Sequence, residues 1–302
     1  MAKFGFVAVI GRPNAGKSTL VNALVGDKIA ITTPVAQTTR HRIRGVLSEA
    51  RGQVVFLDTP GFSKALDKLG EHLVQEARAG LDEADVLLWV VDATQVPGKG
   101  DAWLLGELAK TGKPVVLALN HWDKIPALAT GTGPSRLEAY ATMMSRFPQA
   151  DALVVSAKTK KNQAALLRTL FRRLPSGEPM YPTDTLSDQP MRAVAAELIR
   201  EQAMQLTRDD LPHSVAVAIE AFEEAQLRDE KTVIRAVLYV DHPSRQEILI
   251  GAGGQMIKQI GSRARQSLEA LVEGPVYLDL RVKTQRNWRK DSAFLNRLGL
   301  SS

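Results

Sequence analysis

Five short apolar runs within the first 175 residues, separated by stretches with helical spacing, leave few folds open to this chain. Near-continuous apolar strands that alternate with helices predict a mixed, mostly parallel sheet with helices on both faces. Ligands of such sheets bind at the carboxyl ends of the strands, so the motifs at those ends are the most informative about function. The predicted strands span 4–11, 53–58, 86–92, 114–120 and 152–157, and the predicted helices span 17–25, 69–80, 101–111, 134–146 and 162–174.

The chain is long enough for two domains, because its 302 residues exceed the length at which a single hydrophobic core usually stops growing. Residues 175–190 hold four prolines and few apolar side chains, which is typical of an interdomain linker. We therefore expect a first domain over 1–175, a linker over 176–190 and a second domain over 191–302. The second domain is predicted to contain helices over 191–206 and 254–272 and strands over 214–222, 232–240 and 276–282, while 247–251 fits either a strand or a short helix.

Charge is unevenly distributed along the chain, although the net charge of +6 is small. Residues 190–247 hold 7 basic and 11 acidic side chains, a net charge of −4, whereas residues 248–302 hold 9 basic and 4 acidic ones, a net charge of +5. A basic C-terminal part predicts a face that binds a polyanion, and random scatter of charges explains the pattern equally well. The lack of cysteine excludes disulfides and thiolate metal sites and fits a cytosolic protein. No apolar run approaches the ~20 residues that span a bilayer.

The segment "GRPNAGKST", residues 11–19, lies between the first predicted strand and the first predicted helix. The spacing G-x-x-x-x-G-K-S in that context is typical of a phosphate-binding loop. Gly11 and Gly16 let backbone N–H groups turn toward the phosphates, and the helix adds its positive N-terminus. Lys17 can reach the β- and γ-phosphates, and the Ser18 hydroxyl can ligate Mg²⁺. The predicted nucleotide-binding residues here are Asn14, Ala15, Gly16, Lys17, Ser18 and Thr19.

Two later segments complete the predicted magnesium and γ-phosphate site. Asp58 begins "DTPG" at the end of a predicted strand, where a carboxylate can hold Mg²⁺ through water, and the N–H of Gly61 can sense a γ-phosphate. The polar segment "QTTRH", residues 37–41, can supply a threonine that closes on Mg²⁺ when a triphosphate is bound. The sequence does not decide between Thr38 and Thr39, and we take Thr39 as the ligand. The predicted metal ligands are Ser18, Thr39 and Asp58, and the predicted catalytic residues are Lys17, Thr39 and Gly61.

The stretch "LNHWDKI", residues 119–125, raises the question of which base is bound. Asp123 can accept both the N1–H and the 2-amino group of guanine, whereas adenine offers neither donor and would leave this carboxylate unpaired. Downstream, "SAK" closes another predicted strand, and the N–H of Ala157 can meet guanine O6. These two segments together favour guanine. The predicted base-binding residues are Asn120, His121, Asp123, Ser156, Ala157 and Lys158.

His121 departs from the usual pattern of guanine-binding loops, in which a lysine follows the asparagine. The stem of that lysine packs over the base and ties this loop to the phosphate loop. We expect His121 or Trp122 to stack on the base instead, with guanine specificity kept and affinity reduced.

The segment "GAGG", residues 251–254, opens the helix predicted over 254–272. Glycines at a helix N-terminus can bind an anion, and a G-x-x-G loop of this kind clamps an RNA backbone in K-homology (KH) domains. The order of helix, two strands, G-x-x-G loop, helix and strand resembles an α+β type II KH domain. Relatives often place a lysine in the variable pair that is Ala252-Gly253 here. The predicted RNA-binding residues around the loop are Gly251, Ala252, Gly253, Gly254, Lys258, Arg263 and Arg265.

Residues 282–299 add a basic tail around a single tryptophan. Its cationic side chains are candidates for contacts with RNA phosphates. Trp288 fits an RNA contact and, as the alternative, an anchor that holds the tail on the core. The candidate RNA-binding residues of the tail are Lys283, Arg286, Trp288, Arg289 and Lys290.

The motifs "GRPNAGKSTL", "QTTRHRI", "DTPG" and "VVDA" resemble those of the Era family of bacterial GTPases over about 150 residues, and the tail resembles the "NWR" terminus of that family. The resemblance implies a Ras-like P-loop NTPase domain followed by a KH domain, and hydrolysis of GTP to GDP and phosphate. Phe62 stands where Ras-type enzymes place the glutamine that orients water, so the resemblance implies a low intrinsic rate. Relatives with an asparagine at the position of Asn14 use it to bind K⁺, which we carry over together with Mg²⁺.

The resemblance also implies the partners. Era proteins bind the 3′ end of small-subunit ribosomal RNA during assembly of the small ribosomal subunit, and GTP binding is expected to reposition the C-terminal domain. We expect a cytoplasmic monomer with at most a peripheral contact, through its basic edge, to the anionic inner face of the cell membrane.

Two other functions stay open from the sequence alone. An ATP-dependent phosphotransferase would need an acceptor pocket and an arginine-rich lid, and we find no such lid. A constitutive RNA-binding protein whose nucleotide site is mainly structural is not excluded by any residue.

Overall fold

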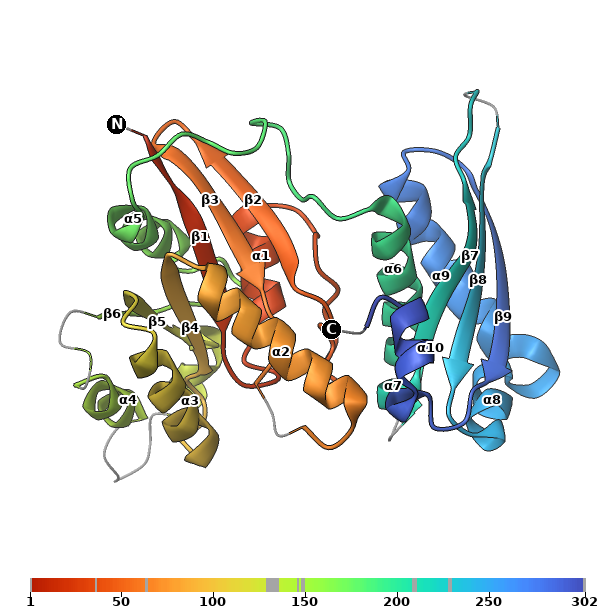
Figure 1. The fold of residues 1–302 in the computed structure, drawn as a ribbon, viewed down its shortest axis with the longest axis horizontal. Coiled ribbons are helices and arrows are strands. Elements are labelled where there is room, and N and C mark those ends of the chain that lie inside the picture. The colour runs from red at the N-terminus through yellow and green to blue at the C-terminus, as the bar shows by residue number, and fades with distance from the viewer. Residues whose placement is uncertain are drawn as a thin grey trace. The chain divides into compact units, whose positions relative to one another are not determined.

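The computed structural model of the chain describes residues 2–35, 37–62, 65–128, 136–145, 147, 150–207, 211–227 and 230–300 (Figure 1). They form two compact units, each with its own sheet and core. The first unit comprises Met1–Ala30, Thr39–Leu66 and Gly70–Asp188, and the second comprises Ile31–Thr38, Asp67–Leu69 and Gln189–Ser302. Two short segments of the N-terminal half of the sequence therefore belong to the second unit.

The first unit is built on a six-stranded sheet with the order β2-β3-β1-β4-β5-β6. All neighbouring strands are parallel except β2 and β3, which are antiparallel. This confirms the predicted mixed, mostly parallel sheet. The strands are β1 (Lys3–Ile10), β2 (Ile43–Glu49), β3 (Gly52–Asp58), β4 (Val86–Asp92), β5 (Val115–Asn120) and β6 (Asp151–Val154).

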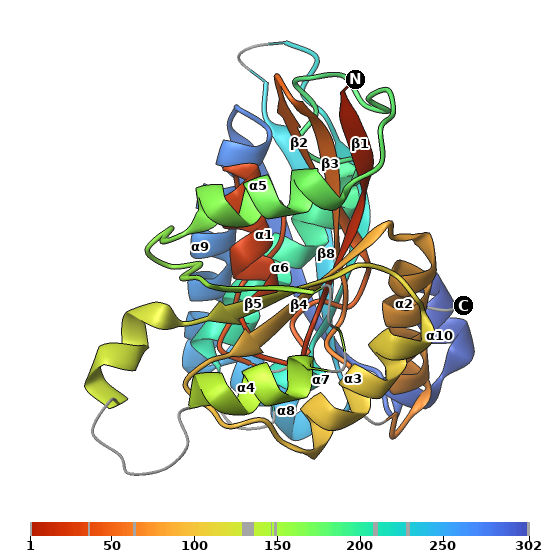
Figure 2. The ribbon, with the colours of Figure 1, turned by 90° about the vertical axis from the view of Figure 1, so that its left-hand side faces the viewer.

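Helices cover both faces of this sheet, as predicted. Helices α1 and α5 pack in one apolar cluster, and α2, α3 and α4 pack in the cluster on the opposite face. Figure 2 shows α1 to one side of β4 and β5 and α3 to the other side. The helices are α1 (Lys17–Val25), α2 (Lys68–Glu83), α3 (Lys99–Lys110), α4 (Arg136–Met144) and α5 (Gln163–Arg173), with a 3-10 helix over Trp122–Leu128.

Strand β2 is not among the five predicted strands. It lies at the edge of the sheet, and its Arg44 side chain is held by two ion pairs. Arg44 lies 2.9 Å from Glu83 and 3.1 Å from Asp188, oxygen to nitrogen. An edge strand with such side chains has no continuous apolar run, which explains why no strand was predicted over these residues.

The second unit is an α+β arrangement with a three-stranded sheet of order β7-β8-β9, in which β8 is antiparallel to β7 and parallel to β9. Helices α6 and α9 and one residue of α8 cover one face of the sheet. The elements are α6 (Met191–Leu206), α7 (Leu211–Ser214), β7 (Ala216–Glu223), β8 (Thr232–Val240), α8 (Pro243–Ile250), a 3-10 turn over Ala252–Gly254, α9 (Gln255–Leu271), β9 (Val276–Thr284), a 3-10 turn over Trp288–Lys290 and α10 (Ser292–Arg297).

The segment 247–251, which fitted either a strand or a helix, forms the end of helix α8. The sequence holds the reason, because Pro243 occupies the first turn and the ring of His242 accepts a hydrogen bond from the N–H of Ser244. Proline and a side-chain acceptor at these positions start helices. Among the residues that the structure describes, no helix is long and apolar enough to cross a membrane.

Gly52 offers a test of the β1–β3 pairing that holds the centre of the large sheet. A Cβ atom on Gly52 would lie 1.9 Å from the carbonyl oxygen of Lys3, a backbone atom that cannot move without breaking the pairing. We expect Gly52→Ala to lower the free energy of unfolding of the first unit by at least about 2 kcal/mol, measured by urea denaturation. Gly106→Ala is the matched control, since Gly106 is exposed within α3 with nothing near its Cβ position, and it should raise stability by about 0.5–1 kcal/mol. Equal effects of the two substitutions would contradict this account.

Candidate functional site

The loop between β1 and α1 has the backbone of a phosphate cradle. Asn14 (φ 64°) and Gly16 (φ 86°) adopt left-handed conformations, and Gly16 is the N-cap of α1. A Cβ atom on Gly16 would lie 2.3 Å from the Nδ2 atom of Asn120, so only glycine fits this position. The loop therefore turns tightly into the positive end of a helix, as the sequence predicted.

Lys17 is buried beneath this loop. Its Nζ atom donates to the carbonyl oxygens of Gly11 and Arg12, each at 3.2 Å. Burial lowers the pKa of Lys17 to about 8, although the nearby Asp58 carboxyl acts in the opposite direction. A phosphate group placed in the loop would favour the charged ammonium again.

Three side chains that carry oxygen atoms lie together at the N-terminal end of α1. The Ser18 hydroxyl donates to Asp58 Oδ2 at 2.6 Å and lies 2.9 Å from Thr39 Oγ1, and Thr39 Oγ1 lies 3.4 Å from the same carboxylate oxygen. The other carboxylate oxygen of Asp58 is buried without a hydrogen-bond partner. Hydroxyl and carboxylate oxygens suit a hard cation such as Mg²⁺, and an unpaired buried carboxylate oxygen fits that assignment.

The same cluster separates the two candidate threonines. The Thr38 hydroxyl donates to the carbonyl oxygen of Val35 at 2.7 Å and lies 2.8 Å from Thr33 Oγ1. Thr39, in contrast, lies with Ser18 and Asp58. The geometry thus favours Thr39 as the metal ligand.

Asn120 joins three loops at the carboxyl edge of the sheet. It is fully buried, its Nδ2 donates to the carbonyl oxygen of Ala15 at 2.9 Å, and its Oδ1 accepts from the N–H of Ala157 at 3.0 Å. The N–H of Ala157, which the sequence assigned to guanine O6, is thus engaged with Asn120 here.

Asp123 is exposed beside this junction and is oriented by Ser156, whose hydroxyl donates to Asp123 Oδ1 at 2.6 Å. This hydrogen bond is the largest of the causes that keep the pKa of Asp123 below its ordinary value. An ionised, oriented and accessible carboxylate can accept the two N–H groups of a guanine edge. Lys158 follows on the same loop and is exposed.

Gly61 and Phe62 follow Asp58 after β3. A Cβ atom on Gly61 would lie 2.9 Å from the backbone nitrogen of Pro13, so Gly61 lies directly against the phosphate loop. The Phe62 side chain instead packs in the apolar layer that contains Ala77, with its ring centroid 5.6 Å from that of Trp103. Phe62 is 6% exposed, and its side chain carries no group that could hydrogen-bond a water molecule.

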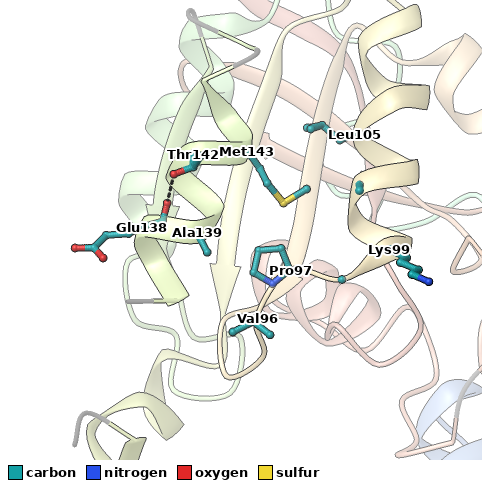
Figure 3. Close-up of a pocket in the computed structure, with 10 residues that line it drawn as sticks. Val96, Pro97, Lys99, Leu105, Glu138, Ala139, Thr142 and Met143 are labelled. Carbon is teal, nitrogen blue, oxygen red and sulfur yellow. Dashed lines mark hydrogen bonds between the residues drawn. The ribbon is translucent and has the colours of Figure 1, made fainter. Parts of the chain in front are cut away.

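The first unit also has an apolar cavity of about 710 Å³ between α3 and α4 (Figure 3). None of the residues predicted for the nucleotide site lines it. Its wall includes Val96, Pro97, Leu105, Ala139 and Met143.

In the second unit the G-x-x-G loop lies between α8 and α9. Gly251 (φ 72°), Gly253 (φ 57°) and Gly254 (φ 78°) are all left-handed, and Cβ positions on the last two meet no atom within 4 Å. The loop is therefore an open turn of bare backbone at the start of α9, beside Ala252.

A groove of about 460 Å³ runs along α9 from this region toward β9. Lys258 and Arg265 line it together with apolar and small residues, whereas Arg263 lies on α9 outside it. The apolar residues of this wall were not among the predicted RNA-binding residues, because apolar side chains with helical or strand spacing more often belong to a core. The lining residues are Ile257, Lys258, Gly261, Ser262, Arg265, Leu278 and Leu280.

The tail residues differ in burial and in their partners. Trp288 is fully buried, and its Nε1 donates to the carbonyl oxygen of Ser214 at 2.9 Å, which favours the alternative that this residue anchors the tail to the core. Arg289 pairs with Asp67 at 2.7 Å and Lys283 with Glu220 at 3.5 Å. The exposed tail cations are Lys283, Arg286 and Lys290.

The pKa of the Asp58 carboxyl leads to a prediction of how magnesium affinity depends on pH. Burial raises the pKa of Asp58 to about 6, although Ser18, Lys17 and Thr39 oppose the shift. A metal needs the ionised carboxylate, so the affinity of the GDP-loaded protein for Mg²⁺ should fall up to about tenfold per pH unit below pH 6 and level off above pH 7. Titration of Mg²⁺ against the rate of GDP release from pH 5 to 8 measures this. Asp58→Asn should bind Mg²⁺ weakly at every pH, and an unchanged pH profile in that variant would show that another group titrates.

Comparisons with known proteins bear on both units. Residues 6–121 match the family model of the 50S ribosome-binding GTPases, and residues 210–289 match that of the KH domain. The chain is 41% identical to GTPase Era of Carboxydothermus hydrogenoformans over 99% of this chain and 98% of that protein, and 43% identical to GTPase Era of Nostoc over 98% and 89%.

Two solved structures are similar to the whole chain. One is Era in complex with MgGDPNP and nucleotides 1506–1542 of 16S ribosomal RNA, with a TM-score of 0.92, 38% identity and full coverage of both chains. The other is a variant of Aquifex aeolicus Era bound to GDP and AlF4⁻, with the same TM-score and identity over 99% of this chain and all of that one. With relatives above 40% identity over nearly its full length, the chain belongs to the Era family of GTPases.

Proposed function

We propose that this GTPase is a switch that binds GTP with Mg²⁺ at the loop between β1 and α1 and binds the 3′ end of small-subunit ribosomal RNA through its KH domain during assembly of the small ribosomal subunit. The observation that carries the proposal is the presence of both sites in one chain whose fold matches, over its full length, a relative that holds both ligands. The proposal keeps the predicted limits of a GTPase part over 1–175, a linker over 176–190 and an RNA-binding part over 191–302, with Ile31–Thr38 and Asp67–Leu69 added to the RNA-binding part.

In the hydrolytic site, Lys17 would contact the β- and γ-phosphates, and the Gly61 N–H would contact the γ-phosphate from the opposite side. Ser18, Thr39 and Asp58 would hold Mg²⁺, which neutralises charge on the phosphates when it is bound. Phe62, buried against Trp103, supports a low intrinsic rate, since its side chain has no group that could hydrogen-bond an attacking water. Asn14, at the turn of the phosphate loop, would bind K⁺ and add positive charge at the transition state.

The groove along α9 gives the sharpest test of RNA binding. Lys258→Ala and Arg265→Ala should each weaken binding of a 16S 3′-end fragment and lower the slope of log affinity against log salt by about 1, because each removes one phosphate contact. Arg263 was also predicted to bind RNA but lies outside the groove, so Arg263→Ala removes the same charge from the same helix and should weaken binding less if the groove holds the RNA. Fluorescence anisotropy over 50–200 mM salt measures all three. Equal losses in all three variants would mean that charge alone, not the groove, binds the RNA.

The second unit supports a coupling between nucleotide and RNA, because it contains the residues that immediately precede the metal ligand Thr39. Within that unit, Arg200 of α6 donates to the carbonyl oxygen of Thr38, and Glu201 accepts from the N–H of Thr32 at 3.0 Å. Arg200 and Glu201 are each only 1% exposed. Arg200 also pairs with Glu197 of the same helix. The two buried side chains thus hold residues 32–38 against α6, and a movement of Thr39 toward Mg²⁺ would change these contacts.

The coupling predicts that RNA affinity differs between the GDP and GDPNP complexes of the wild type. In Arg200→Met the two affinities should agree within about twofold, because the contact to Thr38 is lost, while GDP binding stays close to that of the wild type. Arg192→Met, on the same helix but bonded to β7, is the control, and melting curves followed by circular dichroism check that both variants fold.

By linkage, RNA should change nucleotide affinity by the same factor. Identical RNA affinity in the two nucleotide states of the wild type would favour the alternative, a constitutive RNA-binding protein with a structural nucleotide site.

The location and assembly state follow from the same proposal. A ribosomal partner and the lack of cysteine support a cytoplasmic protein. We expect a monomer, measured by analytical ultracentrifugation, and at most a weak contact with anionic membranes, measured by vesicle sedimentation.

A further inference from the structure

The peptide bond between Arg12 and Pro13 lies beside both residues that are proposed to contact the γ-phosphate. Its carbonyl oxygen accepts from Lys17 Nζ at 3.2 Å and from the N–H of Ala15 at 3.3 Å. Its nitrogen lies 2.9 Å from the position that a Cβ atom on Gly61 would occupy. Because Pro13 has no N–H, this peptide offers no backbone donor that could anchor it. Its orientation therefore depends on what holds the side chains on either side.

The side chain of Arg12 leaves the phosphate loop and is anchored on helix α3. Its Nη1 donates to Asp101 Oδ2 at 3.2 Å, and the same carboxylate oxygen accepts from the N–H of Gly98, the N-cap of α3, at 2.8 Å. A Cβ atom on Gly98 would lie 3.6 Å from Arg12 Nη1, and one on Gly100 would lie 3.5 Å from Arg12 Nε. The guanidinium thus lies against the backbone at the start of α3.

Asp101 is a firm anchor because it is buried. Its side chain is 3% exposed, whereas that of Arg12 is 50% exposed. Burial first, and the nearby Asp101 carboxylate second, raise the pKa of the buried Tyr140 above its ordinary value. A buried carboxylate is stable only when its charge is paired and hydrogen-bonded, and Arg12 supplies the cation. The pair therefore differs from an ion pair between two exposed side chains, which fixes little.

Helix α3 also contacts the segment that follows Gly61. The ring of Trp103, two residues after Asp101, has its centroid 5.6 Å from that of Phe62. One helix thus contacts the phosphate loop through Asp101 and the segment after β3 through Trp103, so it can set the position of both relative to each other.

We propose that Arg12 is a positioning residue for GTP hydrolysis, which ties the phosphate loop to Asp101 of α3 and so holds the carbonyl oxygen that orients Lys17. The proposal rests on the proposed role of Lys17 at the β- and γ-phosphates and adds a residue that acts through Lys17 and not on the nucleotide. A misplacement of about 1 Å can slow a reaction about a hundredfold. Loss of the anchor should therefore lower kcat more than it weakens binding of GTP.

Steady-state GTP hydrolysis tests the anchor. Arg12→Met should lower kcat about ten- to a hundredfold and keep KM for GTP within about threefold of the wild type. Arg12→Lys retains a cation for Asp101 and should keep kcat within about threefold. A wild-type kcat in Arg12→Met, or a raised KM with kcat unchanged, would overturn the proposal.

Lys110→Met is the matched control, because it removes an ion pair from the other end of the same helix, where Lys110 lies 2.5 Å from Glu107. Its kcat should stay within about twofold of the wild type. Melting curves followed by circular dichroism check that each variant is folded at the assay temperature.

A double-mutant cycle separates anchoring from a direct effect of the Arg12 charge on the phosphates. Asp101→Asn keeps an acceptor for the N–H of Gly98 and loses the charge that holds Arg12. If Arg12 acts through Asp101, both single variants and the double variant should have about the same low kcat. A wild-type kcat in Asp101→Asn, or effects that multiply in the double variant, would overturn the proposal.

Lys17→Ala distinguishes a failure of this proposal from a failure of the proposed hydrolytic site. A wild-type kcat in Lys17→Ala would overturn the role of Lys17 itself. Loss of turnover in Lys17→Ala together with a wild-type kcat in Arg12→Met would overturn only the positioning by Arg12.

Discussion

The buried carboxamide of Asn120 is the interaction on which the geometry of the nucleotide site depends. Its two hydrogen bonds fix the loops that follow β1 and β6 to the end of β5, so three separate segments keep one arrangement. Gly16 is confined to glycine by the same side chain. An amide suits this place because it carries a donor and an acceptor at once and adds no charge to an interior that already contains Lys17 and Asp58.

The site is electrostatically prepared for ligands of both signs. Burial moves the pKa of Lys17 down and that of Asp58 up, so that each group is drawn toward its neutral form. A nucleotide phosphate favours the charged lysine and a divalent cation favours the charged carboxylate. The free-energy cost of desolvating the charged forms of Lys17 and Asp58 is thus offset when both ligands bind together.

Local features of this chain could be predicted from sequence, and features that depend on distant partners could not. The parallel strands and the phosphate loop follow from apolar runs and from fixed glycine spacing, and they agree with the structure to within a few residues. Strand β2 was missed because Arg44 is held by Glu83 and Asp188, which the local pattern does not reveal. The burial of Trp288 depends on Ser214, 74 residues away, and the assignment of Thr39 over Thr38 depends on the convergence of Ser18 and Asp58. Such contacts are set by tertiary structure and leave no periodic signal.

The membership of Ile31–Thr38 in the second unit bears on how autonomous the RNA-binding part is. Ile31 is buried in the same apolar cluster as Leu198 and Ile199 of α6, more than 160 residues later in the sequence. A polypeptide cut at the linker would retain every strand and helix of the KH domain and yet lose part of its own core and the backbone groups of Thr38 and Thr32 that Arg200 and Glu201 bind. The folding unit that contains the KH domain is therefore not continuous in the sequence of this chain, and its core is complete only when residues 31–38 are present.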